Sequence, residues 1–229
     1  MHEVFKFEPH LHTAEISPCS CLPAAEGARL VRAAGYRGMM TADHFWDGFI
    51  DRLPAGTPVA EAFFEGYRRA AEAGEREGLF VVPGMELRYR SSHNDYLVFG
   101  MTQEKLAQLG DITRLTPSEG YEVLCQADCL ILQAHPFRNG MTRVEDVHGC
   151  EVFNGHPGHD SRNPLAKAWA DDHPGWLTTA GSDVHDAAHV GRAGLWTPPD
   201  AMRSSQALAA WLASGSAALF IDGEAQHGA

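Results

Sequence analysis

Short apolar runs alternate with longer amphipathic stretches along the chain. The apolar runs predict strands at residues 4–8, 37–41, 79–83, 96–99, 129–133, 149–153, 176–179 and 194–197. Periodic apolar faces predict helices at residues 23–34, 59–77, 117–126, 163–172 and 204–213. Since parallel strands need a crossover connection, this alternation favours the α/β class with a parallel sheet.

The pattern also predicts how the domain is organised. No internal repeat and no linker rich in Ser, Pro or Gly divides the 229 residues. One domain is therefore expected over residues 1–222, followed by a frayed tail at 223–229. Seven or eight strands with intervening helices in this length predict a small, distorted (β/α)7 TIM-like barrel. A doubly wound open sheet is the alternative.

Composition and charge limit the range of possible functions. With 44% hydrophobic and 21% charged residues, the chain is typical of a folded globular protein and not of a disordered one. Its formal net charge of -12 repels phosphate backbones and anionic membrane surfaces, so neither nucleic acid nor membrane is expected as a partner. Thirteen histidines beside 30 carboxylates supply ample ligands for divalent metal ions.

The cysteines and the first residues of the chain indicate the cellular compartment in which the protein is expected. Five cysteines are odd in number and sparse, which argues against a disulfide framework and for a reducing environment. Residues 1–12 lack a basic start followed by an apolar stretch, and no run of about 18 apolar residues occurs. We therefore expect a cytoplasmic protein. Cys19 and Cys21 are interpreted as non-ligands. A metal site built on two such closely spaced cysteines would need further Cys or His ligands, and the nearby histidines are already assigned to the other predicted metal site.

Potential metal ligands stand at or just beyond the ends of the predicted strands. His10 and His12 are two residues apart, which directs both imidazoles to one side of an extended segment. The other positions are Asp43 and His44, Glu86, His135, Glu151 and Asn154, and Asp183 and His185. Because parallel strands end on one face, these groups are expected to converge. They exceed what one tetrahedral ion needs, so two or three divalent ions (Zn, Mn or Fe) are predicted.

Five short motifs carry a family resemblance. They are His10-Leu11-His12-Thr13, Thr41-Ala42-Asp43-His44, Gly84-Met85-Glu86, Ala134-His135-Pro136 and Gly181-Ser182-Asp183-Val184-His185. In order and spacing they resemble the motifs of the PHP (polymerase and histidinol phosphatase) family, over most of the chain. The resemblance implies a distorted (β/α)7 barrel, a cluster of two or three metal ions, and phosphoester hydrolysis.

The resemblance also implies individual ligands. His10, His12, Glu86 and Asp183 would hold a first ion, Glu86 would bridge to an ion held by His135, and His44 with His185 would hold another. Two positions depart from the family pattern. After Thr13 the chain reads Ala-Glu-Ile-Ser-Pro-Cys in place of Ser-Asp-Gly, and Glu15 is our candidate ligand there. Beyond Glu86 we prefer His93 as ligand, with Asp95 as the alternative.

These positions predict a metal-dependent phosphoesterase acting on a small phosphorylated metabolite, with metal-bound hydroxide as the nucleophile. Asp183, Asp43 and His185 are candidates for carrying the proton to the leaving group. Arg138 and Arg88 are candidates for binding phosphate oxygens.

Other residues and other functions stay open at this point. His156 and His159 are expected to be exposed or to line the pocket mouth. One alternative is a C–N or C–O hydrolase using the same metal cluster, as in amidohydrolase barrels. The other is a non-catalytic metal-binding regulatory module.

Overall fold

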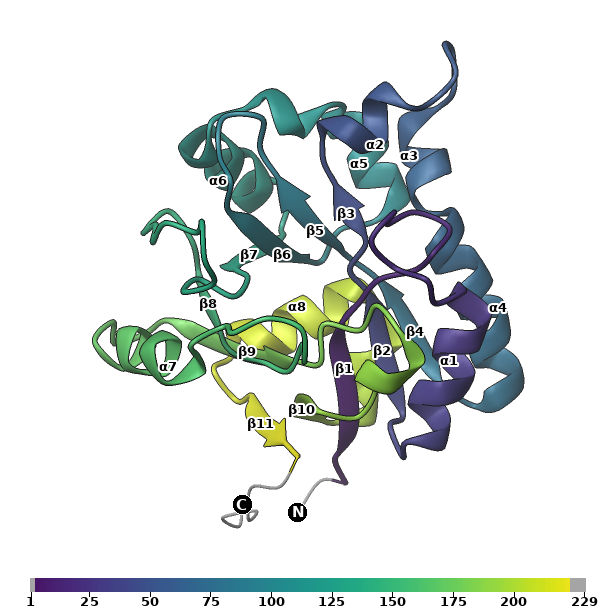
Figure 1. The fold of residues 1–229 in the computed structure, drawn as a ribbon, viewed down its shortest axis with the longest axis vertical. Coiled ribbons are helices and arrows are strands. Elements are labelled where there is room, and N and C mark those ends of the chain that lie inside the picture. The colour runs from purple at the N-terminus through teal and green to yellow at the C-terminus, as the bar shows by residue number, and fades with distance from the viewer. Residues whose placement is uncertain (1–2, 223–229) are drawn as a thin grey trace.

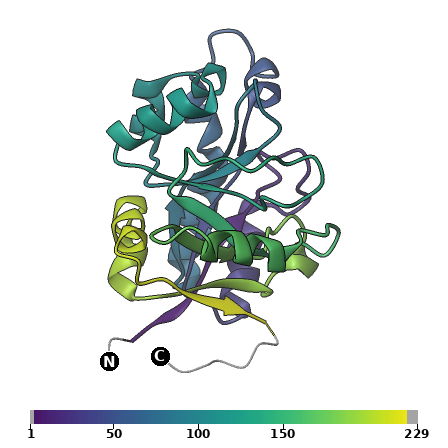
Figure 2. The same ribbon diagram turned by 90° about the vertical axis from the view of Figure 1, so that its left-hand side faces the viewer.

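The computed structural model describes residues 3–222, which form two mixed β-sheets flanked by helices (Figure 1). The first sheet contains, in spatial order, β11 (Ala218–Ile221), β10 (Ala193–Thr197), β1 (Phe5–Leu11), β2 (Gly38–Thr41) and β4 (Phe80–Pro83). Strands β1, β2 and β4 run parallel to one another, whereas β10 is antiparallel to both of its neighbours. In Figure 2, β11 and the beginning of β1 lie at the same end of the molecule.

The second sheet contains, in spatial order, β3 (His44–Phe45), β5 (Met85–Arg88), β6 (Asp95–Phe99), β7 (Leu130–Gln133), β8 (Gly149–Asn154) and β9 (Leu177–Gly181). Strand β6 is antiparallel to β5 and β7, and the remaining pairs are parallel. A parallel bridge between Leu11 and Val184 joins the end of β1 to the segment after β9. The ends of the two sheets therefore meet where several of the predicted ligands lie.

The α/β class is confirmed, but the expectation of an all-parallel sheet is wrong. Three strands escaped prediction: β3, β5 and β11. Strands β5 and β6 form a hairpin in which Arg88 pairs with Asp95, so the chain reverses without a crossover helix. Among the described residues the strands do not pair into one closed sheet. The (β/α)7 barrel and the single domain stay predictions, and the tail at 223–229 lies outside the described residues.

The helices lie close to where they are predicted. They are α1 (Ala24–Ala33), α2 (Asp47–Asp51), α3 (Val59–Phe63), α4 (Glu65–Glu77), α5 (Gln103–Leu109), α6 (Pro117–Gln126), α7 (Asn163–Asp171) and α8 (Ser205–Ala213). Three 3-10 turns span Ile112–Arg114, Ala187–His189 and Pro199–Arg203. The helix expected at 59–77 is divided at Phe64, and α2 and α5 were not predicted. Gly78 ends α4 in the left-handed conformation that glycine favours.

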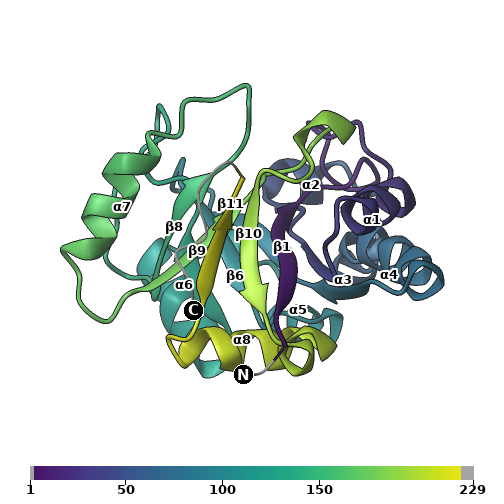
Figure 3. The same ribbon diagram turned by 90° about the horizontal axis from the view of Figure 1, so that it is seen from below.

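The helices cover the sheets from several sides. Figure 3 shows α1 and α4 packed together on one side of β1, and α7 on the far side of β8. Phe7, Met40, Leu97 and Leu132 are fully buried beside Leu208 of α8. Burying each of these side chains contributes roughly 1.5–3 kcal/mol, which fixes the strands that carry the ligands. Within residues 3–222 we find no helix of the length and hydropathy that a membrane span requires.

Candidate metal centre

Four side chains that lie in or just after three strands point to one buried spot. His10 lies in β1 and His12 directly follows it, Glu86 lies in β5, and Asp183 follows β9. The His10 Nε2 atom is 3.5 Å from Glu86 Oε1 and 3.4 Å from Asp183 Oδ1. The His12 Nε2 atom is 3.3 Å from Glu86 Oε2 and 3.4 Å from the same Asp183 oxygen. None of the four side chains is more than 2% exposed. We call these four residues the inner ligands.

His135 joins the inner ligands through Glu86. Its Nε2 atom is 2.9 Å from Glu86 Oε1 and 4.0 Å from an oxygen of Asp95. His135 and Asp183 both have positive φ values, 30° and 53°, which side chains other than glycine rarely adopt. Such a backbone costs roughly 1–3 kcal/mol and is typical of functional sites. Here it turns both side chains toward the same spot.

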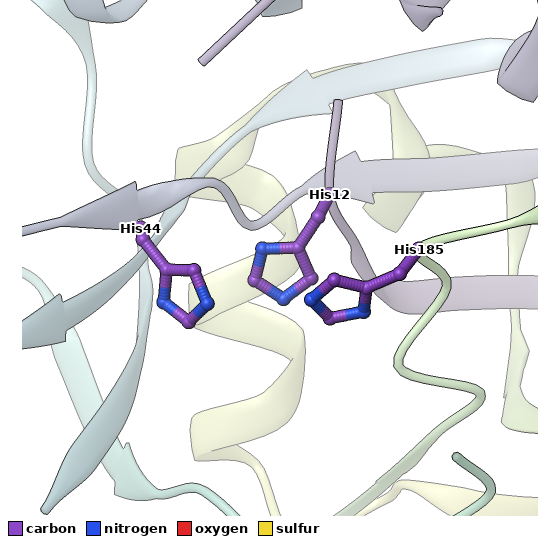
Figure 4. A group of neighbouring side chains, drawn as sticks. All are labelled: His12, His44 and His185. Carbon is purple, nitrogen blue, oxygen red and sulfur yellow. The ribbon is translucent and has the colours of Figure 1, made fainter. Parts of the chain in front are cut away.

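Two further histidines lie on the solvent side of the inner ligands. His44 Nδ1 is 3.0 Å from Glu86 Oε2, and His185 Nδ1 is 3.3 Å from Asp183 Oδ1. Figure 4 shows the rings of His12, His44 and His185 side by side, with His12 in the middle. Their side-chain exposure is 20% for His44 and 13% for His185, in contrast to 0% for His12. These two histidines therefore form an outer, more accessible part of the cluster.

A carboxylate behind His10 fixes the orientation of its ring. The His10 Nδ1–H group donates a 2.8 Å hydrogen bond to Oε1 of Glu151, which is itself buried in β8. The other oxygen of Glu151 accepts from the His135 backbone N–H and the Asn154 side chain. With Nδ1 protonated, the Nε2 atom of His10 is left with a free lone pair directed at the cluster. Glu151 stood out in the sequence as a residue at a strand end, but its role was not predicted.

Asp43 is connected to His12 through Ser17. Its carboxylate accepts hydrogen bonds from the Thr13 N–H at 2.7 Å, the Thr13 hydroxyl at 2.8 Å and the Ser17 hydroxyl at 2.7 Å. Ser17 Oγ in turn lies 3.3 Å from His12 Nδ1. Burial raises the pKa of Asp43 to about 6, against the effect of these hydrogen bonds. These contacts connect Asp43 to the His12 ring through Ser17, and its role as a proton carrier stays a prediction.

The inner ligands fit a divalent cation. His10 Nε2, His12 Nε2 and Asp183 Oδ1 are buried and have no hydrogen-bond partner among the described residues. Because an unpaired buried polar atom costs about 1–3 kcal/mol, three such atoms converging on one spot fit a divalent cation as their common partner. Although burial raises the pKa of a carboxyl, His44 and His10 hold that of Glu86 well below its usual range. The carboxylate is therefore ionised and ready to bind metal.

Two predicted ligands do not reach the cluster. The Glu15 carboxylate accepts from the Ala24 N–H at the start of α1 and lies 3.8 Å from Arg69. It lines a separate cavity of about 650 Å³ that contains none of the inner ligands. His93 lies in the turn before β6 and is not among the residues that line the cluster's cavity, whereas Asp95 is. The geometry thus favours Asp95, because β6 is antiparallel and its first residue lies at the ligand-bearing edge.

Cys19 lies beside the cluster but is in none of the groups of described residues that could hold a metal ion. Cys19 lies in the segment where the chain departs from the Ser-Asp-Gly pattern, and it lines the same cavity as His44 and His185. Partial burial acts to raise the pKa of its thiol, but hydrogen bonds with His185 and His44 outweigh this and lower it to about 6. Spacing along the sequence gave no sign of this contact, because both histidines are distant in the chain.

The cavity over the cluster measures about 340 Å³ and is bordered by basic side chains. Arg138 donates to Asp183 Oδ2 at 2.8 Å and to Asn154 Oδ1 at 2.8 Å. Arg88 is paired with both oxygens of Asp95 at 2.7 Å each. His156 and His159 line the same cavity, as expected for residues at its mouth. Basic groups at the entrance of a metal cluster suit an anionic substrate.

A second group of histidines near the mouth is less suited to metal. His156, His185 and His189 offer nitrogens within 4.8 Å of one another. However, the Nδ1 atom of His156 already accepts from the Gly158 N–H at 3.0 Å. The Nδ1 atom of His189 likewise accepts from the His185 N–H at 3.2 Å. In the neutral ring the other nitrogen then carries the proton, so it donates a hydrogen bond and does not ligate.

Comparison with known proteins agrees with this geometry at the level of the fold. No family model matches the chain, and no curated protein sequence matches it. A solved two-domain protein from Bacteroides vulgatus, described as containing a predicted PHP-like metal-dependent phosphoesterase, matches 96% of this chain with a TM-score of 0.66 and 14% identity. The chain spans 65% of the length of that protein.

Two other solved structures are similar. An amidohydrolase from Chromobacterium violaceum with bound sulfate matches 94% of this chain and 98% of its own, with a TM-score of 0.55 and 14% identity. The lesion-specific endonuclease EndoQ from Pyrococcus furiosus matches 84% of this chain and 52% of its own, with a TM-score of 0.54 and 17% identity. The resemblance to PHP-like phosphoesterases is thus confirmed for the fold.

Proposed function

We propose that this chain is a metal-dependent phosphoesterase that hydrolyses a small phosphorylated metabolite. The observation that carries the proposal is the convergence of His10, His12, Glu86 and Asp183, with three buried atoms that have no partner among the described residues. A cluster of this kind bordered by Arg88 and Arg138 suits a phosphate group. The PHP-like phosphoesterase and the endonuclease among the similar structures support this class of reaction.

The residues divide into three sets of ligands. In our proposal the inner ligands hold one ion, His135 and Asp95 share Glu86 with a second, and His44 and His185 hold a third. Zn, Mn or Fe suits these nitrogen and carboxylate ligands. When bound, such ions neutralise phosphate oxygens and lower the pKa of coordinated water toward 7.

The protein supplies orientation and charge. Glu151 holds the His10 ring, and the pair Ser17–Asp43 holds the His12 ring, so that neither has to reorient when substrate binds. Arg138, whose Nη2 lies between Asp183 and Asn154, offers donors to non-bridging phosphate oxygens as they gain charge.

Proton transfer to the leaving group depends on how many ions bind. In a two-ion centre His185 is free to protonate the departing oxygen, and its 13% exposure places it toward the cavity mouth. In a three-ion centre His185 is a ligand. His156 is unsuited to donate this proton, because burial lowers its pKa to about 4 and the ring stays neutral near pH 7.

Two features favour a small substrate. The cavity of about 340 Å³ is the size of a small-molecule site, and the net charge of -12 opposes binding of a polyanion. The alternative is hydrolysis of a C–N or C–O bond on the same cluster, which the amidohydrolase among the similar structures favours.

The deciding experiment is a substrate screen of the metal-loaded protein. Phosphomonoesters, a dinucleotide phosphodiester, single-stranded oligonucleotides, amides and lactones would be compared with Zn, Mn and Fe, using Glu86→Gln as the inactive control. Metal-dependent turnover of a phosphomonoester that the variant lacks supports the proposal. Turnover confined to amides or lactones supports the alternative, turnover confined to oligonucleotides indicates a nuclease, and metal binding with no turnover supports the regulatory module.

A further inference from the structure

Two arginines border the cavity, and each pairs with a carboxylate of the cluster in a different way. The Nη2 atom of Arg138 donates to Oδ2 of Asp183 at 2.8 Å, and Oδ1 of Asp183 has no hydrogen-bond partner among the described residues. Arg88 engages both oxygens of Asp95, because its Nε donates to Oδ1 and its Nη2 donates to Oδ2, each at 2.7 Å. Asp183 thus keeps one oxygen for a metal ion, whereas both oxygens of Asp95 are already paired.

Asp95 stands at the position proposed for the second ion. Its Oδ2 atom is 4.0 Å from Nε2 of His135, which in turn is 2.9 Å from Oε1 of Glu86. Asp95, Glu86 and His44 also offer ligand atoms that all lie within 4.8 Å of one another. A guanidinium held in a fork on Asp95 competes with an ion for the carboxylate oxygens, and its positive charge repels a cation beside it.

The Arg88 side chain is placed to exchange Asp95 for another anion. It is 37% exposed, in contrast to 15% for Arg138, and it lines the cavity over the cluster. A guanidinium binds phosphate oxygens with the same fork of donors that it uses for a carboxylate. A phosphate group in this cavity therefore offers Arg88 a second partner, and the exchange leaves the buried Asp95 carboxylate free for a cation.

We propose that Arg88 blocks the second metal position while the cavity holds no phosphate group, and that a bound phosphate group frees Asp95 by binding the guanidinium instead. This inference rests on the proposed metal centre and on a substrate that carries phosphate. Since coupling between two binding sites is reciprocal, phosphate and the second ion each raise the affinity for the other. The complete centre thus assembles only when a phosphate group is present.

The experiment counts the Mn²⁺ ions bound by the full chain, from the electron paramagnetic resonance signal of free Mn²⁺, with and without inorganic phosphate. Without phosphate, Arg88→Gln should raise the affinity for the second ion by about tenfold, since it removes both the competing fork and a positive charge. Asp95→Asn should abolish this affinity in the wild-type and Arg88→Gln backgrounds alike, which assigns the ion to Asp95.

Arg90→Gln is the matched control for the loss of one positive charge. Arg90 is 32% exposed, donates to Asp111 and Thr113, and is absent from the described residues that line the cavity. Its substitution should leave the affinity for Mn²⁺ unchanged. An affinity in Arg88→Gln that equals that of the wild type would overturn the proposal. A lower affinity would also overturn it, because Arg88 would then orient Asp95 for the ion as Arg138 orients Asp183.

Phosphate provides a measurement on the wild-type protein itself. Inorganic phosphate should raise the affinity for the second ion about tenfold more in the wild type than in Arg88→Gln. The same solutions serve both proteins, so that binding of Mn²⁺ by free phosphate cancels. Equal effects in the two proteins, or no effect in the wild type, would overturn this inference alone. If neither protein binds Mn²⁺ in any of these solutions, the proposed metal centre fails as well.

Discussion

The inner and outer parts of the cluster are built differently. Around His10 and His12 the opposite ring nitrogens are held by Glu151 and by Ser17, and the side chains are fully buried. The Nδ1 atom of His185 lies 3.1 Å from the Asp183 backbone carbonyl and 3.3 Å from Asp183 Oδ1, but the His185 side chain is 13% exposed and that of His44 is 20% exposed. Ligands fixed in advance bind metal more tightly. We therefore expect the inner ion to be retained on purification and the outer ion to exchange.

The largest expected effect comes from Glu86→Gln, which removes the carboxylate common to both parts. Glu86 contacts His12, His44 and His135, so its loss should lower metal content and reduce kcat/KM by about 10² to 10³ or more. Elemental analysis and steady-state kinetics check this. Glu75→Gln, on the exposed face of α4, is the control. Normal turnover with full metal occupancy would refute the bridging role.

Glu151→Gln tests the inner part alone. An amide cannot accept from His10 on one atom and from the His135 N–H and Asn154 on the other, so one of these contacts is lost. We expect affinity for the tightest ion to fall by about 10- to 100-fold, as measured by competition with a chelating dye. The weaker, outer affinity should change little. If both affinities fell equally, the distinction between the two parts would be lost.

Arg138→Ala tests substrate binding and not metal binding. The guanidinium spans Asp183 and Asn154 at the cavity, and we expect its removal to raise the KM for phosphorylated substrates about tenfold, with metal content retained. Arg138→Lys should recover only part of the loss, because a single ammonium cannot donate in a fork. An unaltered KM in Arg138→Ala would place this residue outside the substrate site.

A smaller effect is expected from Glu8, which lies behind His10. Burial raises the pKa of Glu8 to about 8, against the effect of hydrogen bonds from Ser182 and His10. Between the ordinary value of 4.5 and about 8, the folded protein keeps a proton that the unfolded chain has released, so stability falls as the pH rises.

Glu8→Gln removes this proton linkage while keeping an acceptor for both backbone N–H groups. From pH 6 to pH 7 the metal-free wild type should lose about 1 kcal/mol of unfolding free energy relative to the variant. Urea unfolding of both proteins at the two pH values measures this difference, and contributions from titratable groups that do not interact with Glu8 cancel. A difference that stays constant with pH would show that Glu8 does not titrate in this range.

The sequence predicted which side chains converge more successfully for residues near strand ends than for residues in connections. His10, His12, His135 and Asp183 lie at or just beyond the ends of β1, β7 and β9, and the structure brings them together with Glu86, the second residue of β5. The connections depend on hydrogen bonds between distant segments, which no local pattern encodes. The Glu15 carboxylate accepts a hydrogen bond from the Ala24 N–H at the start of α1, and Cys19 lines the cavity of the cluster.

The choice between His93 and Asp95 shows why topology matters. The preference for His93 follows from the family resemblance, whereas an all-parallel sheet would place the start of β6 away from the edge that carries the ligands. Strand β6 is antiparallel, so its first residue, Asp95, faces the cluster directly opposite Arg88. The hydrophobic pattern of the sequence does not predict this hairpin clearly, because β5 is only four residues long. Because β5 and its hairpin with β6 were not predicted, a regular parallel sheet was expected.

The most direct test of the central claim is anomalous X-ray diffraction from crystals of the full chain grown with zinc, with data collected on either side of the zinc absorption edge. We predict anomalous density bounded by His10, His12, Glu86 and Asp183, with weaker density near His44 and His185. Density confined to the histidines at the cavity mouth, His156 and His189, or no density beside the inner ligands, would contradict the account.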